Sequence, residues 1–283
     1  MANDRMQTSR FELKYVISEE VAQQIRTYVS AFLDVDENGA NKPHFSYQVH
    51  SLYIDSDEMK TYWDTINGNK NRFKLRVRYY EDSPDKPAFL EIKRRMNNCI
   101  QKQRVGIRRE AMPMILNGQL PPPSLMLGHE PRHLLAIQNF CRLIQDLRAK
   151  PKMHVAYLRE AYLPPTDNTA RVTLDRDVRS EPNPAGVLKT TMQNPIQVWG
   201  NAVVLELKFT NRYPNWFRDL VCAFNLRQCG AAKYADGFSL LSGRTPQHRH
   251  LPQTNGHWQW SSPQTTTEQD VAPLPDQAAE ERA

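Results

Sequence analysis

One stretch of the chain carries a cationic side chain at every second position. Arg72, Lys74, Arg76 and Arg78 alternate with Phe73 and other apolar or aromatic residues. Successive side chains of an extended strand point to opposite faces, so the four cations would share one face. Four like charges in a row repel one another unless anions lie among them. Arginine suits two-point contacts to phosphate oxygens and lysine acts as a point charge, so the pattern is typical of a phosphate-binding surface.

Four other segments with strand character repeat this alternation of charged and apolar residues. Their charged faces hold Arg10, Glu12 and Lys14, then Glu91 and Lys93, then Lys102 and Arg104, and finally Glu206 and Lys208. A single strand of this kind is usually a solvated sheet face. Five of them fit a closed antiparallel barrel whose apolar faces pack outward, because all the charged faces would then line the lumen. Such a lumen suits a polyanionic phosphate chain together with a divalent metal.

The elements that would position these residues can be read along the chain. We expect strands over 10–17, 45–54, 70–80, 87–95, 99–109, 152–162, 170–178 and 202–210. Helices are predicted after Ser18 and after Ser56, over 134–147, and from Pro214. The polar turns between 70 and 109 favour an antiparallel meander. The sequence therefore predicts an α+β fold for 1–244, in which a closed antiparallel β-barrel tunnel with a charged lumen is flanked by helices.

The charge balance differs between the two ends of the chain. The 283 residues include 37 Lys and Arg against 31 Asp and Glu, a formal charge of +6. Residues 245–283 hold two of the basic and five of the acidic residues, which leaves 35 basic and 26 acidic residues in 1–244. The folded part is thus more cationic than the whole, which favours an anionic partner. The Pro-, Gln- and Thr-rich segment 245–283 has no apolar period and is expected to be disordered.

Composition also excludes several classes of protein. No apolar window approaches a membrane span and no secretory signal is present, so direct membrane insertion is not expected. The four cysteines form no CxxC pair, which argues against a zinc site and favours a cytoplasmic location. Nucleic-acid binding is disfavoured because Phe73, Tyr79 and Phe209 fall on the faces opposite the charges. A P-loop is absent.

The residues described so far belong to a series of motifs that resembles a known family. The chain is similar to the VTC domain, the polyphosphate polymerase domain of the vacuolar transporter chaperone complex and a member of the triphosphate tunnel metalloenzyme superfamily. The resemblance spans roughly 8–240. It rests on nine ordered motifs: Arg10–Tyr15, Ser51–Asp55, Arg72–Arg78, Glu91–Lys93, Lys102–Arg104, Tyr157–Arg159, Thr173–Arg176, Leu205–Lys208 and Lys233–Tyr234.

The resemblance implies a metal-dependent phosphotransferase that transfers the γ-phosphate of ATP to a growing polyphosphate chain. Its substrates would be ATP and inorganic polyphosphate, and its cofactor Mn²⁺ or Mg²⁺. Carried over to this sequence, Arg76, Arg78, Lys93 and Arg159 are expected as catalytic residues, Lys14, Lys102 and Lys233 as phosphate-binding residues, and Glu206 as the metal ligand. Lys74, Arg104 and Lys208 share the charged strand faces, and Tyr157 lies two residues before Arg159, so we expect these four to bind phosphate as well.

Two departures from the family pattern bear on the function. Gly230-Ala231-Ala232 stands where the eukaryotic polymerases carry a second lysine and a serine. The hydrolytic branch of the superfamily opens with an ExExK motif, whose first acid is replaced here by Arg10, which disfavours a triphosphatase or an adenylate cyclase. A metal-dependent triphosphate or polyphosphate hydrolase and a non-catalytic polyphosphate-binding module remain the alternatives. The chain lacks the membrane modules of the eukaryotic polymerase, so membrane coupling would need a separate partner.

Three further carboxylates could bind the metal alongside Glu206. These are Glu12, Glu91 and Asp175. Asp175 is equally consistent with an ion pair to a neighbouring arginine such as Arg171, because buried charges need partners. The sequence leaves the choice of metal and the oligomeric state open.

Overall fold

The computed structural model describes residues 10–165, 167 and 169–244. Its strands are β1 (Arg10–Ile17), β2 (Asp34–Val35), β3 (Ser46–Asp55), β4 (Asn71–Tyr79), β5 (Ala88–Met96), β6 (Cys99–Ile107), β7 (Lys150–Leu163), β8 (Ala170–Pro182), β9 (Ile196–Gln197) and β10 (Val203–Thr210). Its α-helices are α1 (Glu19–Val29), α2 (Glu37–Ala40), α3 (Lys60–Ile66), α4 (Met112–Leu116), α5 (Pro131–Leu147), α6 (Asn215–Ala223) and α7 (Lys233–Leu241). The expected disorder of 245–283 lies outside the described residues.

Eight of the strands form a closed antiparallel barrel. Neighbouring strands follow the order β7-β3-β4-β5-β6-β1-β10-β8, and β7 pairs with β8 to close the ring. The short strand β2 pairs with β7, and the short strand β9 pairs with β8. Pairing between β1 and β6 is limited to Arg10 and Ile100, so the two strands meet at only one corner. The predicted barrel is confirmed, and its strand limits differ from the predicted ones by a few residues at most.

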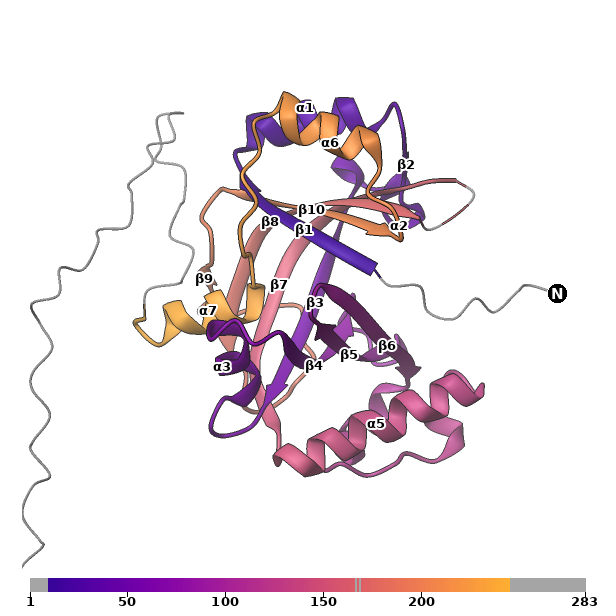
Figure 1. The fold of residues 1–283 in the computed structure, drawn as a ribbon. Coiled ribbons are helices and arrows are strands. Elements are labelled where there is room, and N and C mark those ends of the chain that lie inside the picture. The colour runs from indigo at the N-terminus through magenta and orange to yellow at the C-terminus, as the bar shows by residue number, and fades with distance from the viewer. Residues whose placement is uncertain (1–9, 166, 168, 245–283) are drawn as a thin grey trace, which may run out of the picture. The chain divides into compact units, whose positions relative to one another are not determined.

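The apolar strand faces point outward and are covered by helices, as the alternation predicts. Helix α5 packs on the β3–β6 side, where Phe140 and Ile144 join Leu52, Leu75 and Leu90 in one core. Helices α1 and α6 cover the other half of the barrel, and Figure 1 shows them together over β1, β8 and β10. Their side chains form a second core with the outward-facing residues of these strands. Burial of both apolar faces leaves the charged faces to the interior.

Helix ends follow the local signals in the sequence. Ser18 accepts a hydrogen bond from the Val21 amide and caps α1, whose first turn is acidic. Pro131 starts α5, and Arg148 ends it in a left-handed conformation with φ of 47°. None of the described helices is long and apolar enough to cross a membrane.

Helix α7 is the main element that the sequence did not predict. Its N-cap residue, Ala232, has no side chain that could cap it, although the Asp236 carboxylate accepts a hydrogen bond from the Ala232 amide. A tertiary contact also holds α7 in place. The Tyr234 hydroxyl donates a 2.8 Å hydrogen bond to the buried Asp55 carboxylate at the end of β3. The same carboxylate accepts from the Thr61 and Tyr62 amides at the start of α3. Asp55 thus joins β3, α3 and α7, and it fixes the segment that carries Lys233.

Candidate functional site

The strand register decides which charges meet inside the barrel. Across β4 and β5, Arg76 lies opposite Glu91 and Lys74 lies opposite Lys93. Across β1 and β10, Lys14 lies opposite Glu206. Facing residues in antiparallel strands are close enough to interact, so these pairs alternate between attraction and repulsion.

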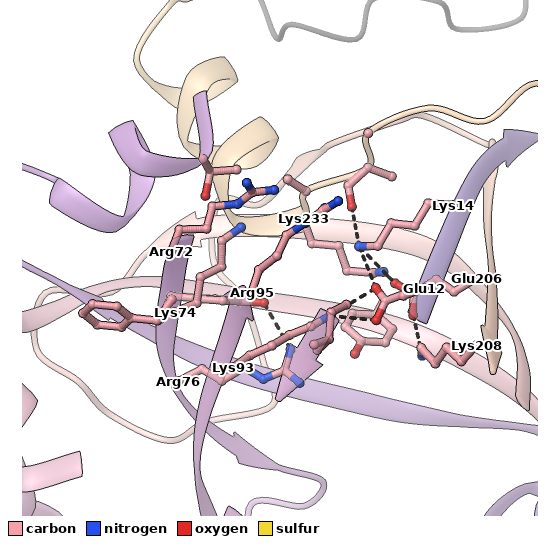
Figure 2. Close-up of a pocket in the computed structure, with 18 of the residues that line it drawn as sticks. Glu12, Lys14, Arg72, Lys74, Arg76, Lys93, Arg95, Glu206, Lys208 and Lys233 are labelled. Atoms are coloured by element: carbon pink, nitrogen blue, oxygen red, sulfur yellow. Dashed lines mark hydrogen bonds and ion pairs between the residues drawn. The ribbon is translucent and has the colours of Figure 1, made fainter. Parts of the chain in front are cut away.

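The interior contains a cavity of about 230 Å³. Ten basic side chains and two carboxylates line it, a formal surplus of eight positive charges. The basic residues are Lys14, Arg72, Lys74, Arg76, Arg78, Lys93, Arg95, Arg159, Lys208 and Lys233, and the acids are Glu12 and Glu206. Figure 2 shows Arg72 and Lys74 on the opposite side of the cavity from Glu12 and Glu206. A cavity of this charge is built for a polyanion.

Glu206 is the most heavily paired carboxylate of the cavity. Its oxygens lie 2.6 Å from Lys208 Nζ, 3.1 Å from Lys233 Nζ, 3.3 Å from Lys14 Nζ and 3.5 Å from Arg159 Nη2. Burial alone would raise the pKa of Glu206, but Lys208 and the other cations lower it well below its usual value. Burial lowers the pKa of Lys208 to about 8, although Glu206 opposes this shift. Glu206 is therefore ionised and holds four cations around one point.

Asp175 lies beside this group and is fully buried. It accepts two hydrogen bonds of 2.7 Å from Arg159 and forms an ion pair of 2.7 Å with Lys233. Burial opposes ionisation of Asp175, yet Arg159 and Lys233 lower its pKa. The suggested ion pair of Asp175 with an arginine is present, but its partner is Arg159 and not Arg171, which contacts Asp36. Asp175 acts as the counter-ion of two expected phosphate-binding residues.

A second buried carboxylate, Glu91, organises the opposite wall. Arg76 lies 2.6 Å from it, Lys102 lies 2.7 Å from it and Arg104 lies 3.6 Å from it. Burial would raise the pKa of Glu91, but Arg76 and its neighbours lower it well below its usual value. Lys102 and Arg104 pair with Glu91 and are not among the residues that line the cavity, unlike Arg76.

Two tyrosines place the guanidinium groups. Arg78 donates to the Tyr157 hydroxyl over 2.9 Å, and Arg76 donates to the Tyr53 hydroxyl over 3.3 Å. Arg159 and Lys233 also approach the Tyr157 ring, at 5.1 Å and 4.9 Å from its centroid. Cation–π contacts of this kind orient cations and leave their charge available.

The structure brings most of the predicted site residues to one cavity. Lys14, Lys74, Arg76, Arg78, Lys93, Tyr157, Arg159, Glu206, Lys208 and Lys233 all line it, and their roles stay predictions. Sequence reasoning placed Arg72 on the cationic strand face without giving it a role, and it missed Arg95 and Tyr53 as site candidates. The signal for Arg95 was available, because it continues the Glu91 and Lys93 face of β5 by one more alternate position. The segment 228–232, which lines the same cavity, carried no such pattern.

Glu12 and Glu206 are the carboxylates that could hold a divalent metal. Both lie 3.3 Å from Lys14 Nζ, so they are close to one another. The described residues contain no group of three or more Asp, Glu, His or Cys suited to a metal. One or two carboxylates suffice for Mg²⁺-like ions when substrate phosphates complete the coordination. The cavity therefore fits a metal that is shared with bound phosphate.

Comparisons with known proteins identify one matching family and two structures of low sequence identity. The sequence model of the VTC domain family matches residues 9–242. No match was found among the curated proteins. A solved Bacillus halodurans structure, described as an adenylate cyclase, is 11% identical with a TM-score of 0.43, and the alignment covers 80% of this chain and 94% of that one. A Hippeastrum protein, described as an adenylyl cyclase with a dominant triphosphatase activity, is 13% identical with a TM-score of 0.45, and the alignment covers 84% and 98%.

Proposed function

The chain belongs to the VTC domain family, and on this premise we propose that it is a polyphosphate polymerase. The reaction transfers the γ-phosphate of ATP to the end of an inorganic polyphosphate chain. The observation that carries the proposal is the cavity itself, which is lined by ten cations and two carboxylates. Even with Glu91 and Asp175 counted as counter-ions behind the lining, the cations outnumber the carboxylates, and this excess favours a polyanionic ligand such as a phosphate chain.

The chemistry needs no nucleophile from the protein. An oxygen of the chain's terminal phosphate forms the new bond to the γ-phosphorus, the bond from that phosphorus to the β–γ bridging oxygen breaks, and ADP leaves with the electron pair. Cys229 lines the cavity, but burial raises the pKa of its thiol and keeps it protonated. Positioning and charge neutralisation supply most of the acceleration in phosphoryl transfer.

The arginines are placed to hold the transferred group. Arg76, Arg78 and Arg159 converge from β4 and β7 on one cavity, and each is fixed by a tyrosine or carboxylate partner. Fixed guanidinium groups bind phosphate oxygens without reorganising during the reaction. Lys93 is the cation between this group and Glu12, with which it forms a 2.8 Å ion pair. When substrate binds, its phosphates would replace the carboxylates as ion-pair partners of these cations.

The superfamily implies a divalent metal, and we propose that this metal is Mn²⁺ or Mg²⁺. Glu206, together with Glu12, would hold the ion against the phosphate oxygens. When bound, the metal supplies additional neutralisation of the charge on the group being transferred. The surrounding lysines Lys14, Lys208 and Lys233 would then bind phosphate in place of Glu206.

Product analysis tests this proposal. Purified protein is incubated with ATP and Mn²⁺, and the products are separated by gel electrophoresis alongside an assay for free orthophosphate. Lengthening polyphosphate supports a polymerase. Orthophosphate without chain growth would identify a hydrolase, and binding without either product would identify a binding module. Arg159→Met should abolish chain growth, whereas the matched control Arg218→Gln, an exposed residue of α6, should retain it.

A further inference from the structure

Three cations lie together at one end of the cavity. Arg72, Lys74 and Arg95, which we call the mouth cluster, form no ion pair with a carboxylate of the described residues. The cavity cations deeper in the barrel are held by Glu12, Glu91, Asp175 or Glu206, except for Arg78, which bonds to Tyr157. The mouth cluster is therefore a group of neighbouring cavity cations that no carboxylate of the described residues holds.

The strand register concentrates this charge. Arg72 lies directly opposite Arg95, and Lys74 lies directly opposite Lys93. Like charges in facing positions of antiparallel strands are destabilising, so the free protein maintains a repulsion that a bound anion would relieve. The next pair inward joins Arg76 to Glu91, so the change from repulsive to attractive pairs falls between Lys74 and Arg76.

Backbone carbonyls hold the two arginines in place. Arg72 donates to the Asn69 carbonyl oxygen, and Arg95 donates to the Asn97 carbonyl oxygen over 2.8 Å. Such bonds orient a guanidinium group without neutralising its charge. Burial, together with repulsion from Arg95, lowers the pKa of Arg72, which reflects the same uncompensated charge. The three side chains are partly buried, so they are not a freely solvated strand face.

The length of β4 separates the mouth cluster from the inner cations. Arg72 and Arg78 are six residues apart, which corresponds to roughly 20 Å of extended strand. Arg76, the nearest of the inner arginines, is four residues from Arg72, or roughly 13 Å along β4, so a triphosphate held by Arg76, Arg78 and Arg159 does not reach Arg72 as well. A longer phosphate chain can occupy both ends of the cavity at once.

We propose that the mouth cluster is a separate anion subsite that binds the phosphates of a linear polyphosphate beyond the three held by the inner cations. The protein would therefore prefer long chains to triphosphates. This inference rests on the proposed function of the cavity as a phosphate site. It adds a group of residues that would determine which length of polyphosphate chain the protein prefers.

Calorimetric titration without ATP or metal tests the subsite separately from turnover. Tripolyphosphate and a linear polyphosphate at least twice as long are titrated into the wild type, Arg72→Gln, Arg95→Gln and the control Arg218→Gln. Each mouth variant should weaken binding of the long chain by about tenfold, equivalent to 1.4 kcal/mol, and leave tripolyphosphate binding within about twofold. Arg218→Gln should change neither affinity.

Two results would overturn the subsite. Equal weakening for both ligands would place the triphosphate itself at the mouth, and unchanged long-chain affinity would show that the mouth binds no phosphate. The thermal midpoint of each ligand-free variant should equal or exceed that of the wild type, because a repulsive charge is removed. A protein that prefers long chains yet forms none from ATP would refute the polymerase and leave the subsite intact.

Discussion

Asp175 offers a direct test of the buried carboxylates as counter-ions of the phosphate-binding cations. Asp175→Asn keeps the shape of the side chain and removes its charge. Arg159 and Lys233, each 2.7 Å from this carboxylate, would then share Glu206 as their only acidic partner among the described residues. Breaking a buried ion pair on one side typically costs about 3–5 kcal/mol, because the remaining charge is left uncompensated.

The expected loss is large enough to measure by thermal unfolding. For a domain of this size, each kcal/mol shifts the midpoint by about 2–4 °C, so Asp175→Asn should lower it by about 6–20 °C. Added tripolyphosphate should raise the midpoint of the variant by more than that of the wild type, because the ligand replaces the missing anion. The control Asp219→Asn, an exposed residue of α6, should change neither quantity.

The two halves of this experiment exclude different explanations. A loss below about 1 kcal/mol would show that Asp175 is not an essential counter-ion. A large loss with the same response to tripolyphosphate as the wild type would show that Asp175 supports the fold without standing in for a bound phosphate. Only a larger loss with a larger recovery agrees with the counter-ion role.

Three further predictions concern the metal, the pH dependence and the domain limits. Glu206→Gln should still bind tripolyphosphate but lose metal-dependent chain growth at least about a hundredfold, and a wild-type metal response would leave Glu12 as the ligand. Lys74 faces Lys14, Lys93, Arg72 and Asp236, and burial together with repulsion from Lys14 and Lys93 lowers its pKa to about 7. A bound anion raises this pKa again, so the complex holds a proton that the free protein loses above about pH 7, and long-chain affinity should fall by up to about tenfold per pH unit. Lys74→Arg stays charged and should remove this part of the pH dependence; an unchanged slope in calorimetry would contradict the assignment. Truncation after Arg244 should leave the thermal midpoint and activity nearly unchanged, because the sequence of 245–283 has no periodic apolar face, and a drop of several degrees would refute the proposed boundary.

The barrel could be predicted from the sequence because its determinant is local. The two-residue period of β1, β4, β5, β6 and β10 assigns every side chain to one of two faces, and the excess of cations on one face indicates an anionic ligand. This reasoning placed Arg76, Arg78 and Glu206 inside without any knowledge of the partner strands.

The ion pairs could not be predicted, because they depend on register. Arg159 lies opposite Asp175 only because the β7–β8 pairing shifts between Ala156 and Leu158. Lys102 and Arg104 share a strand face with the cavity residues, yet they pair with Glu91 and do not line the cavity, a difference that alternation does not encode. Helix α7 depends on the distant Asp55 and Tyr234 contact, so no local signal marks it.

The central claim is that the cationic cavity extends a phosphate chain. The most direct measurement is phosphorus NMR of samples taken at successive times from the reaction with ATP and metal, each stopped with a chelator before its spectrum is recorded. Signals of internal chain phosphates distinguish polyphosphate from orthophosphate and from the end groups of short products. We expect the internal signal to grow as the γ-phosphate of ATP disappears. Growth of orthophosphate alone, with no internal signal, would contradict the polymerase.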